Sequence, residues 1–209
     1  MIRLLCLVLG YFFGAFQTAY FYGKMHGIDI RTKGSGNAGT TNTLRVLGTK
    51  AGMIVLAGDV LKTILAITVT RLFILPDFAE PSMEYLLVLY TAAGAILGHN
   101  YPFYMQFKGG KGIATSLGVL LITNWQIGLI CLVFAIVLMA LTKMVSMGSV
   151  GAAILYPVLV LFIHTNYTVS EGSGYLIFSI MLAAIVAFNH RANIKRLMNG
   201  TENRISFKK

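Results

Sequence analysis

The chain has 209 residues, of which 56% are hydrophobic and only 11% are charged, and its mean hydropathy is +0.75. This balance excludes a soluble domain of ordinary composition and indicates an integral membrane protein. The net charge of +10 does not indicate a nucleic-acid partner, because the basic residues lie in short loops between apolar runs. Cys6 and Cys131 lie inside apolar runs, so the sequence predicts neither a disulfide framework nor a metal site.

Seven apolar runs predict an all-α integral membrane protein with seven transmembrane helices in a single polytopic domain over residues 1–209. The first run, residues 2–23, includes Tyr20 and Tyr22 and has no small-residue cleavage site, so we expect an uncleaved span instead of a signal peptide. The second to seventh runs are expected at 51–75, from 85 to the His99 region, 113–124, 127–142, 147–164 and 174–189. The fourth run, 113–124, is short, and we expect it to be tilted or buried among other helices.

The distribution of charge predicts the orientation of these spans. One face collects fourteen of the 17 lysines and arginines, whereas the other carries Asp77, Glu80, Glu84 and Glu171. By the positive-inside rule the basic face is cytoplasmic, so the N-terminus is expected outside and the C-terminus inside. The basic residues of that face are Lys24, Arg31, Lys33, Arg45, Lys50, Lys108, Lys111, Lys143, Arg191, Lys195, Arg196, Arg204, Lys208 and Lys209.

A glycine-rich basic loop interrupts the apolar pattern within GHNYPFYMQFKGGKGIAT, residues 98–115. Glycines without a Cβ can take positive φ and turn N–H groups toward one anion, while two lysines supply charge. A P-loop is excluded, because no Ser or Thr follows the second lysine directly. The pattern predicts a phosphate site, the alternative being a basic surface loop that faces lipid headgroups. Its candidate residues are His99, Lys108, Gly109, Gly110, Lys111 and Gly112.

A second glycine-rich segment, GSGNAGTTN at residues 34–42, has the spacing G-x-G-x-x-G. A dinucleotide-binding fold is not indicated, since neither the preceding strand nor a βαβ unit is present. The dense set of short polar side chains beside Arg45, which includes Asn42, fits an oxygen-rich ligand, and a flexible connector is the alternative. The candidates for binding are Ser35, Gly36, Asn37 and Arg45.

Two charged residues, Asp59 and Lys62, lie three apart inside the second expected span and therefore on one helical face. Charges at that depth are costly and usually pair or serve a site. Mutual neutralisation is the favoured interpretation, and support of Arg45 or Lys111 is the alternative.

Close helix packing is predicted by two G-x-x-x-G patterns, Gly10 with Gly14 and Gly94 with Gly98. His99 follows directly, and a histidine there fits a buried hydrogen-bond anchor or a ligand contact.

The end of the last expected span carries His190 and Asn193, which we expect on one side of the helix. An imidazole and an amide can orient a hydroxyl and steady an oxyanion. The expected topology places this junction, the turn at 143–149 and both glycine-rich loops at the cytoplasmic surface, so one site could draw on all four.

The motifs GSGNAGTTN with Arg45, GHNYPFY with FKGGKGIAT, VSMGS, and HRANIKRL followed by Gly-Thr-Glu resemble those of the bacterial membrane glycerol-3-phosphate acyltransferase that uses acyl phosphate as donor. The resemblance spans nearly the whole chain. It implies seven spans in the bacterial cytoplasmic (inner) membrane, with the active site on the cytoplasmic face. It also implies transfer of a fatty acyl group from acyl phosphate to the 1-hydroxyl of glycerol 3-phosphate, giving lysophosphatidic acid and phosphate, as the first acylation of phospholipid biosynthesis.

The resemblance further implies roles for individual residues, without a metal, a cofactor or a covalent nucleophile. Either His190 or the donor's own phosphate would accept the proton, and a functional link to the soluble enzyme that makes acyl phosphate is implied beside contacts with membrane lipids. Ala192 departs from many relatives, which have an acidic residue there, and Glu202 matches a structural tail position. The implied active-site residues are Ser35, Arg45, Lys111, Ser149, His190 and Asn193, with Lys108 and His99 nearby.

A transporter for a phosphorylated solute is the rival function, because intramembrane Asp59 and Lys62 and glycine-interrupted helices would suit one. Against it, the candidate site lies at one surface and not at the bilayer midplane, and no internal repeat is visible. A structural membrane subunit would leave the polar glycine-rich loops unexplained.

Overall fold

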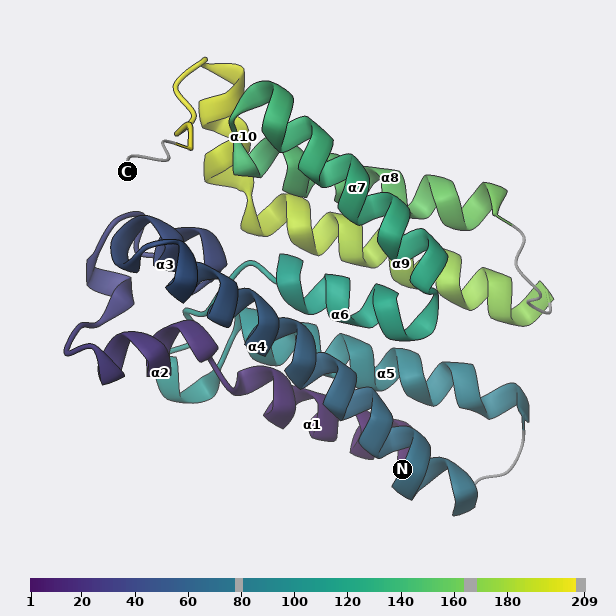
Figure 1. Ribbon diagram of the computed structural model, residues 1–209. Helices are drawn as coiled ribbons and strands as arrows, with labels where there is room; N and C mark the ends of the chain where they lie inside the picture. The colour runs from purple at the N-terminus through teal and green to yellow at the C-terminus, as the bar shows by residue number, and fades with distance from the viewer. Residues whose placement is uncertain (78–80, 164–168, 206–209) are drawn as a thin grey trace. The chain divides into compact units, whose positions relative to one another are not determined.

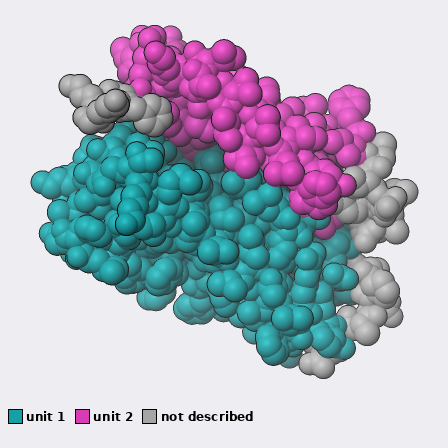
Figure 2. All heavy atoms as spheres, in the orientation of Figure 1, with its two compact units in different colours: residues 1–123 teal, residues 124–209 magenta. Residues whose placement is uncertain are grey.

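The computed structural model describes residues 1–77, 81–163 and 169–205, and within them every regular element is a helix. Glu80, Lys208 and Lys209, which entered the prediction of topology, lie outside the described residues. The chain divides into two compact units, residues 1–123 and 124–209 (Figure 2). The expectation of a single domain remains a prediction.

Unit 1 contains the helices that surround both glycine-rich loops (Figure 1). Gly48, at φ 88°, joins two of them, α3 and α4. The main helices are α1 (Ile2–Ala15), α2 (Thr18–Met25), α3 (Thr40–Leu47), α4 (Thr49–Val69), α5 (Pro81–Asn100) and α6 (Ile113–Thr123); the short turns are η1 (Ile30–Thr32), η2 (Thr70–Ile74), η3 (Leu75–Asp77) and η4 (Phe103–Met105).

Unit 2 is built from three long helices and one short terminal helix: α7 (Trp125–Thr142), α8 (Val145–Phe162), α9 (Val169–Asn189) and α10 (Arg191–Met198). Helix α8 packs against both α7 and α9. Cys6 and Cys131 are both buried free thiols.

Helices lie at all seven expected positions, and within the described residues five of these segments are long and apolar enough to cross a membrane. The short fourth segment is α6, which is largely buried as expected, since most of its side chains pack inside the chain. The five segments are Ile2–Met25, Thr49–Ile74, Trp125–Thr142, Val145–Phe162 and Gly172–Asn189.

The first segment is broken at Phe16 and Gln17 and is not the continuous helix that its apolar run predicts. The break frees backbone carbonyls that lack helical partners, and side chains from elsewhere satisfy them. The Tyr104 hydroxyl donates to Ala15 O at 2.8 Å, and Lys62 Nζ donates to Phe16 O at 2.8 Å. A break in an apolar layer persists only where such partners are supplied.

The paired glycines of α1 and α5 confirm the prediction of close packing, because each of them faces the backbone of the other helix. A Cβ at Gly10 would overlap the Thr91 carbonyl, and one at Gly14 would overlap the Ala95 carbonyl. In the other direction, a Cβ at Gly98 would overlap the carbonyl of Tyr11. Residue numbers rise together along both helices, so α1 and α5 run parallel, as the first and third spans of the predicted topology should.

Replacing Gly14 with alanine is expected to destabilise the protein by about 1–3 kcal/mol, because the added methyl group meets backbone that cannot move aside. Thermal unfolding in detergent would measure the loss. Gly172→Ala in α9 is the matched control, since its Cβ would meet nothing within 4 Å. Equal melting temperatures for the two variants would contradict the close approach of α1 and α5.

Candidate functional site

The first glycine-rich loop is held in shape by Asn42, which lies in α3. Asn42 Oδ1 accepts a hydrogen bond from Ser35 N at 2.8 Å, and Nδ2 donates to the carbonyls of Ile30 and Lys33, both at 3.0 Å. The side chain is buried, so these bonds are shielded from water. Asn42 is thus a scaffold of the loop, which corrects its interpretation as a direct ligand donor.

Positive φ at Gly34 (58°) and Gly36 (73°) turns the chain around this asparagine. Gly34 has no room for a side chain, because a Cβ would overlap Asn42 Oδ1. The turn leaves Ser35 and Gly36 exposed and Asn37 half-buried, while Arg45 is exposed one turn further along α3. These four candidates therefore belong to one short loop and the helix that follows it.

In the second loop only Gly112, at φ 83°, has the positive φ that the sequence suggested for three glycines. Gly109 and Gly110 are required for close approach instead, since a Cβ at Gly109 would overlap His99 O and one at Gly110 the His99 ring. Their N–H groups donate to Asn100 O and His99 O, both at 3.0 Å. These two N–H groups therefore anchor the loop on α5, contrary to the expectation that they bind an anion.

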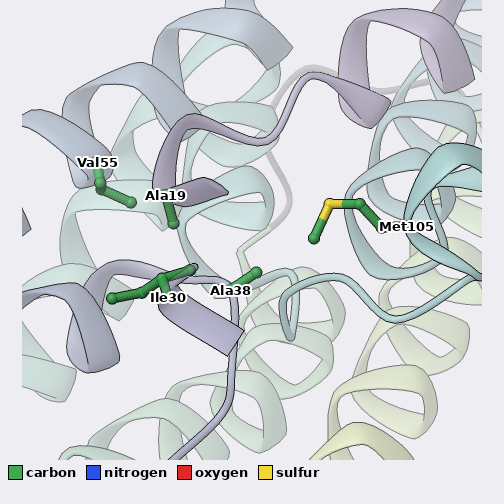
Figure 3. Packing of buried hydrophobic residues seen from close by; sticks show 5 residues of the cluster. All are labelled: Ala19, Ile30, Ala38, Val55 and Met105. Atoms are coloured by element: carbon green, nitrogen blue, oxygen red, sulfur yellow. The ribbon is translucent and has the colours of Figure 1, made fainter. Parts of the chain in front are cut away.

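The two glycine-rich loops approach each other at Ala38 and Gly110, where a Cβ on Gly110 would lie 3.0 Å from Ala38 O. A hydrophobic cluster supports this approach (Figure 3). It joins Ala38 of the first loop to Met105, which precedes the second, together with Ala19, Ile30 and Val55. This contact joins segments that lie far apart in the sequence, so it could not be predicted from the motifs. Exposed Lys108 and half-buried Lys111 thus belong to the same unit as Ser35 and Arg45.

Asp59, Lys62 and His99 form a buried ionic cluster beneath the loops, with 1%, 5% and 2% of their surfaces exposed. Lys62 Nζ lies 2.8 Å from Asp59 Oδ1 and 2.8 Å from His99 Nδ1. Thr18 Oγ1 donates to the same carboxylate at 3.1 Å. The pairing of Asp59 with Lys62 is as expected from their spacing. Of the two roles left open for His99, a buried hydrogen-bond anchor or a ligand contact, the structure favours the buried anchor.

Arg31 is basic and lies beside the first loop, but its guanidinium is already paired with Asp29. It forms a two-pronged ion pair with Asp29, with Nη2 2.7 Å from Oδ2 and Nε 3.0 Å from Oδ1, and its guanidinium lies over the Tyr20 ring. The hydrogen bonds from Arg31 lower the pKa of Asp29 to about 2. This bonding distinguishes Arg31 from the exposed Arg45.

In unit 2, His190 lies at the junction of α9 and α10, and not within one continuous helix as expected. Its Nδ1 lies 2.9 Å from Val186 O. A carbonyl can only accept, so Nδ1 carries the hydrogen and Nε2 of the neutral ring carries the lone pair. The buried ring is thus held in the tautomer that a general base at Nε2 requires.

Asn193 is oriented by Glu202 of the C-terminal tail. Asn193 Nδ2 donates to Glu202 Oε1 at 2.8 Å, and Arg196 Nε donates to Oε2 at 2.9 Å. Burial raises the pKa of Glu202, but these hydrogen bonds outweigh it and hold that pKa below its usual value. Ser149, buried near the start of α8, belongs to the same unit. The resemblance implied a structural role for Glu202, and these contacts show that it holds the side chains of Asn193 and Arg196.

Glycine-rich loops with exposed lysine and arginine, carried on long apolar helices, define a multi-pass helical membrane protein with a candidate site for an anionic ligand. The family model for glycerol-3-phosphate acyltransferase matches residues 4–200. The chain belongs to the glycerol-3-phosphate acyltransferase family.

Curated relatives match along the whole chain. A glycerol-3-phosphate acyltransferase of Clostridioides difficile (strain 630) is 43% identical over 97% of this chain and 95% of its own length. Another, of Thermoanaerobacter sp. (strain X514), is 39% identical over 100% and 98%.

Two solved structures of PlsY (YgiH), an integral membrane glycerol 3-phosphate acyltransferase, have a similar fold. The glycerol 3-phosphate form has a TM-score of 0.84 and 30% identity, over 98% of this chain and 96% of that one. The lysophosphatidic acid form has a TM-score of 0.82 and 30% identity, over 98% and 95%.

Asn42→Ala is expected to lower stability by about 2–3 kcal/mol, because it removes three hydrogen bonds that are largely shielded from water. Limited proteolysis of the segment 30–36, together with thermal unfolding, would measure the effect. Thr41→Ala is the matched control in the same helix, since Thr41 takes no part in these three bonds. Unchanged cleavage of the segment would show that Asn42 does not hold the loop.

Proposed function

We propose that the protein transfers a fatty acyl group from acyl phosphate to the 1-hydroxyl of glycerol 3-phosphate, with lysophosphatidic acid and phosphate as products. The family and the names of the relatives support glycerol 3-phosphate as the acceptor. The observation that carries the proposal is the approach of two glycine-rich loops that bring basic side chains into one unit. Acyl phosphate as donor rests on the resemblance of the motifs.

In the proposed reaction the hydroxyl oxygen attacks the acyl carbon, the bond from that carbon to the phosphate oxygen breaks, and inorganic phosphate leaves. Arg45, Lys108 and Lys111 neutralise the phosphate groups, and Ser35 donates to them from the exposed turn. The mixed anhydride is already activated, so no nucleotide is consumed. Much of the rate enhancement would come from holding the acceptor hydroxyl against the carbonyl.

His190 is the proposed acceptor of the hydroxyl proton, because its Nδ1 contact with Val186 O leaves the lone pair on Nε2. Asn193, fixed by Glu202, would orient the acceptor, and Ser149 would donate to it. The leaving phosphate is the alternative proton acceptor. Either route balances the reaction, since the hydroxyl proton ends on phosphate or passes to it through the imidazole.

We also propose that all seven helical segments span the bacterial cytoplasmic membrane, with the N-terminus outside and both glycine-rich loops at the cytoplasmic face. The distribution of basic residues supports this orientation. Such a site could receive the acyl chain sideways from the bilayer and glycerol 3-phosphate from the cytoplasm. A functional link to the soluble enzyme that makes acyl phosphate would follow.

Cysteine labelling in intact cells tests the orientation. In a Cys6→Ala and Cys131→Ala background, Asp77→Cys is expected to react with an impermeant maleimide from outside. Lys50→Cys and Lys195→Cys are expected to react only after permeabilisation. Labelling of Lys50→Cys in intact cells would reverse the proposed orientation.

Phosphate release from palmitoyl phosphate by the purified protein in lipidic mesophase tests the reaction. Release is expected to depend on glycerol 3-phosphate and to be accompanied by lysophosphatidic acid. Lys111→Ala is expected to reduce the rate by about 100-fold or more, because it removes a charge that stabilises the transition state. Lys50→Ala, an exposed lysine outside the proposed set, is the control. Release that is independent of the acceptor in a folded protein would contradict the proposed function.

A further inference from the structure

The ammonium group of Lys62 has three donors, and the structure supplies three acceptors in the buried region around it. They are Phe16 O, Asp59 Oδ1 and His99 Nδ1, each at 2.8 Å. Each acceptor belongs to a different segment: the break after α1, α4 itself, and the end of α5. Neutralisation of the Asp59 carboxylate requires only one of these three contacts. The other two connect the helix break at Phe16 to His99.

The contact with Lys62 determines the protonation of the His99 ring. An ammonium group has no lone pair, so it must donate to Nδ1, and the neutral ring then carries its hydrogen on Nε2. Nε2 faces Gly110, where any Cβ would overlap it. The ring is therefore held with its Nε2–H directed at the point where the second glycine-rich loop approaches Ala38.

The backbone of His99 reinforces this arrangement. His99 O accepts from Gly110 N at 3.0 Å and from Gln17 Nε2 at 2.8 Å. Gln17 lies at the same helix break that presents Phe16 O to Lys62. The break, the ionic cluster and the glycine loop therefore form one continuous set of hydrogen bonds that ends one residue before Lys111.

We propose that Lys62 and Asp59 are positioning residues that act through His99 to fix Gly109–Lys111, and with it the lysine that binds phosphate. This rests on the proposed function for the identity of the ligand. Lys62 makes no contact with substrate in this proposal. Its effect reaches the site through His99, whose ring packs against Gly110 and whose carbonyl accepts from Gly110 N. Displacement of a binding group by about 1 Å is enough to cost a large factor in rate.

The test separates positioning from stability. Lys62→Met alone leaves a buried carboxylate without its partner and can prevent folding. The double variant Asp59→Leu with Lys62→Met removes both charges, and replacement of a buried pair by apolar residues is often neutral or stabilising. We expect the double variant to unfold at a higher temperature than Lys62→Met alone, because it leaves no buried charge without a partner. We expect the Gly109 and Gly110 amides to exchange hydrogen about 10-fold faster or more.

Kinetics and a conservative pair of His99 variants complete the design. The KM for glycerol 3-phosphate is expected to rise about 10-fold or more in the double variant. His99→Asn, whose amide oxygen can accept from Lys62 in place of Nδ1, is expected to stay within about 5-fold of the wild-type KM. His99→Gln, whose amide replaces Nε2 and leaves Lys62 without that acceptor, is expected to behave like the double variant.

Thr70→Val is the matched control. It removes the buried hydrogen bond of 2.8 Å between the hydroxyls of Thr70 and Thr91. This bond joins η2, which directly follows α4, to α5. This variant is expected to lower the melting temperature without changing the KM or the exchange of Gly109 and Gly110.

Wild-type exchange and wild-type KM in the double variant would overturn the proposal and leave the pair as a self-neutralising one. Hydrogen exchange needs no turnover, so it decides the proposal even if the wild-type protein transfers no acyl group, a result that would reject the proposed function alone.

Discussion

The arrangement of unit 1 depends on satisfying one buried ammonium group. Lys62 lies in an apolar layer, where an unpaired charge is costly, and its three acceptors come from three separate segments. Any motion that separates α1, α4 or the end of α5 breaks at least one of these contacts. The penalty for exposing the charge to an apolar environment therefore keeps the segments together more strictly than packing of apolar side chains would.

Close packing of α1 on α5 makes this geometry possible. Gly14 and Gly98 let the two backbones approach until side chains have no room, and the ends of both helices then lie near the Lys62 cluster. His99, next after Gly98, is placed between that cluster and the second glycine-rich loop. The small residues and the buried charge thus serve one purpose, which is to fix where the loop begins.

Hydropathy was sufficient to predict helices at seven positions, because each apolar run, including the short fourth one, stands between polar flanks. Spacing was sufficient to predict that Asp59 pairs with Lys62. The break at Phe16 could not be predicted, since the residues there favour no turn and the partners of the freed carbonyls lie 46 and 89 residues away. Likewise, glycine at 110 reads the same in sequence whether it serves positive φ or close approach, and only its neighbours decide which.

The bonding of Lys62 also bears on the rival transport function. A charged pair in a carrier must release one partner to bind its solute, so some of its donors have to be available or exchangeable. Here the three donors of the ammonium are matched by three acceptors, and Asp59 takes a further bond from Thr18. Such a closed set suits a fixed scaffold. The exposed cations, by contrast, take no part in these bonds, since Lys108 lies on the second glycine-rich loop and Arg45 lies in α3.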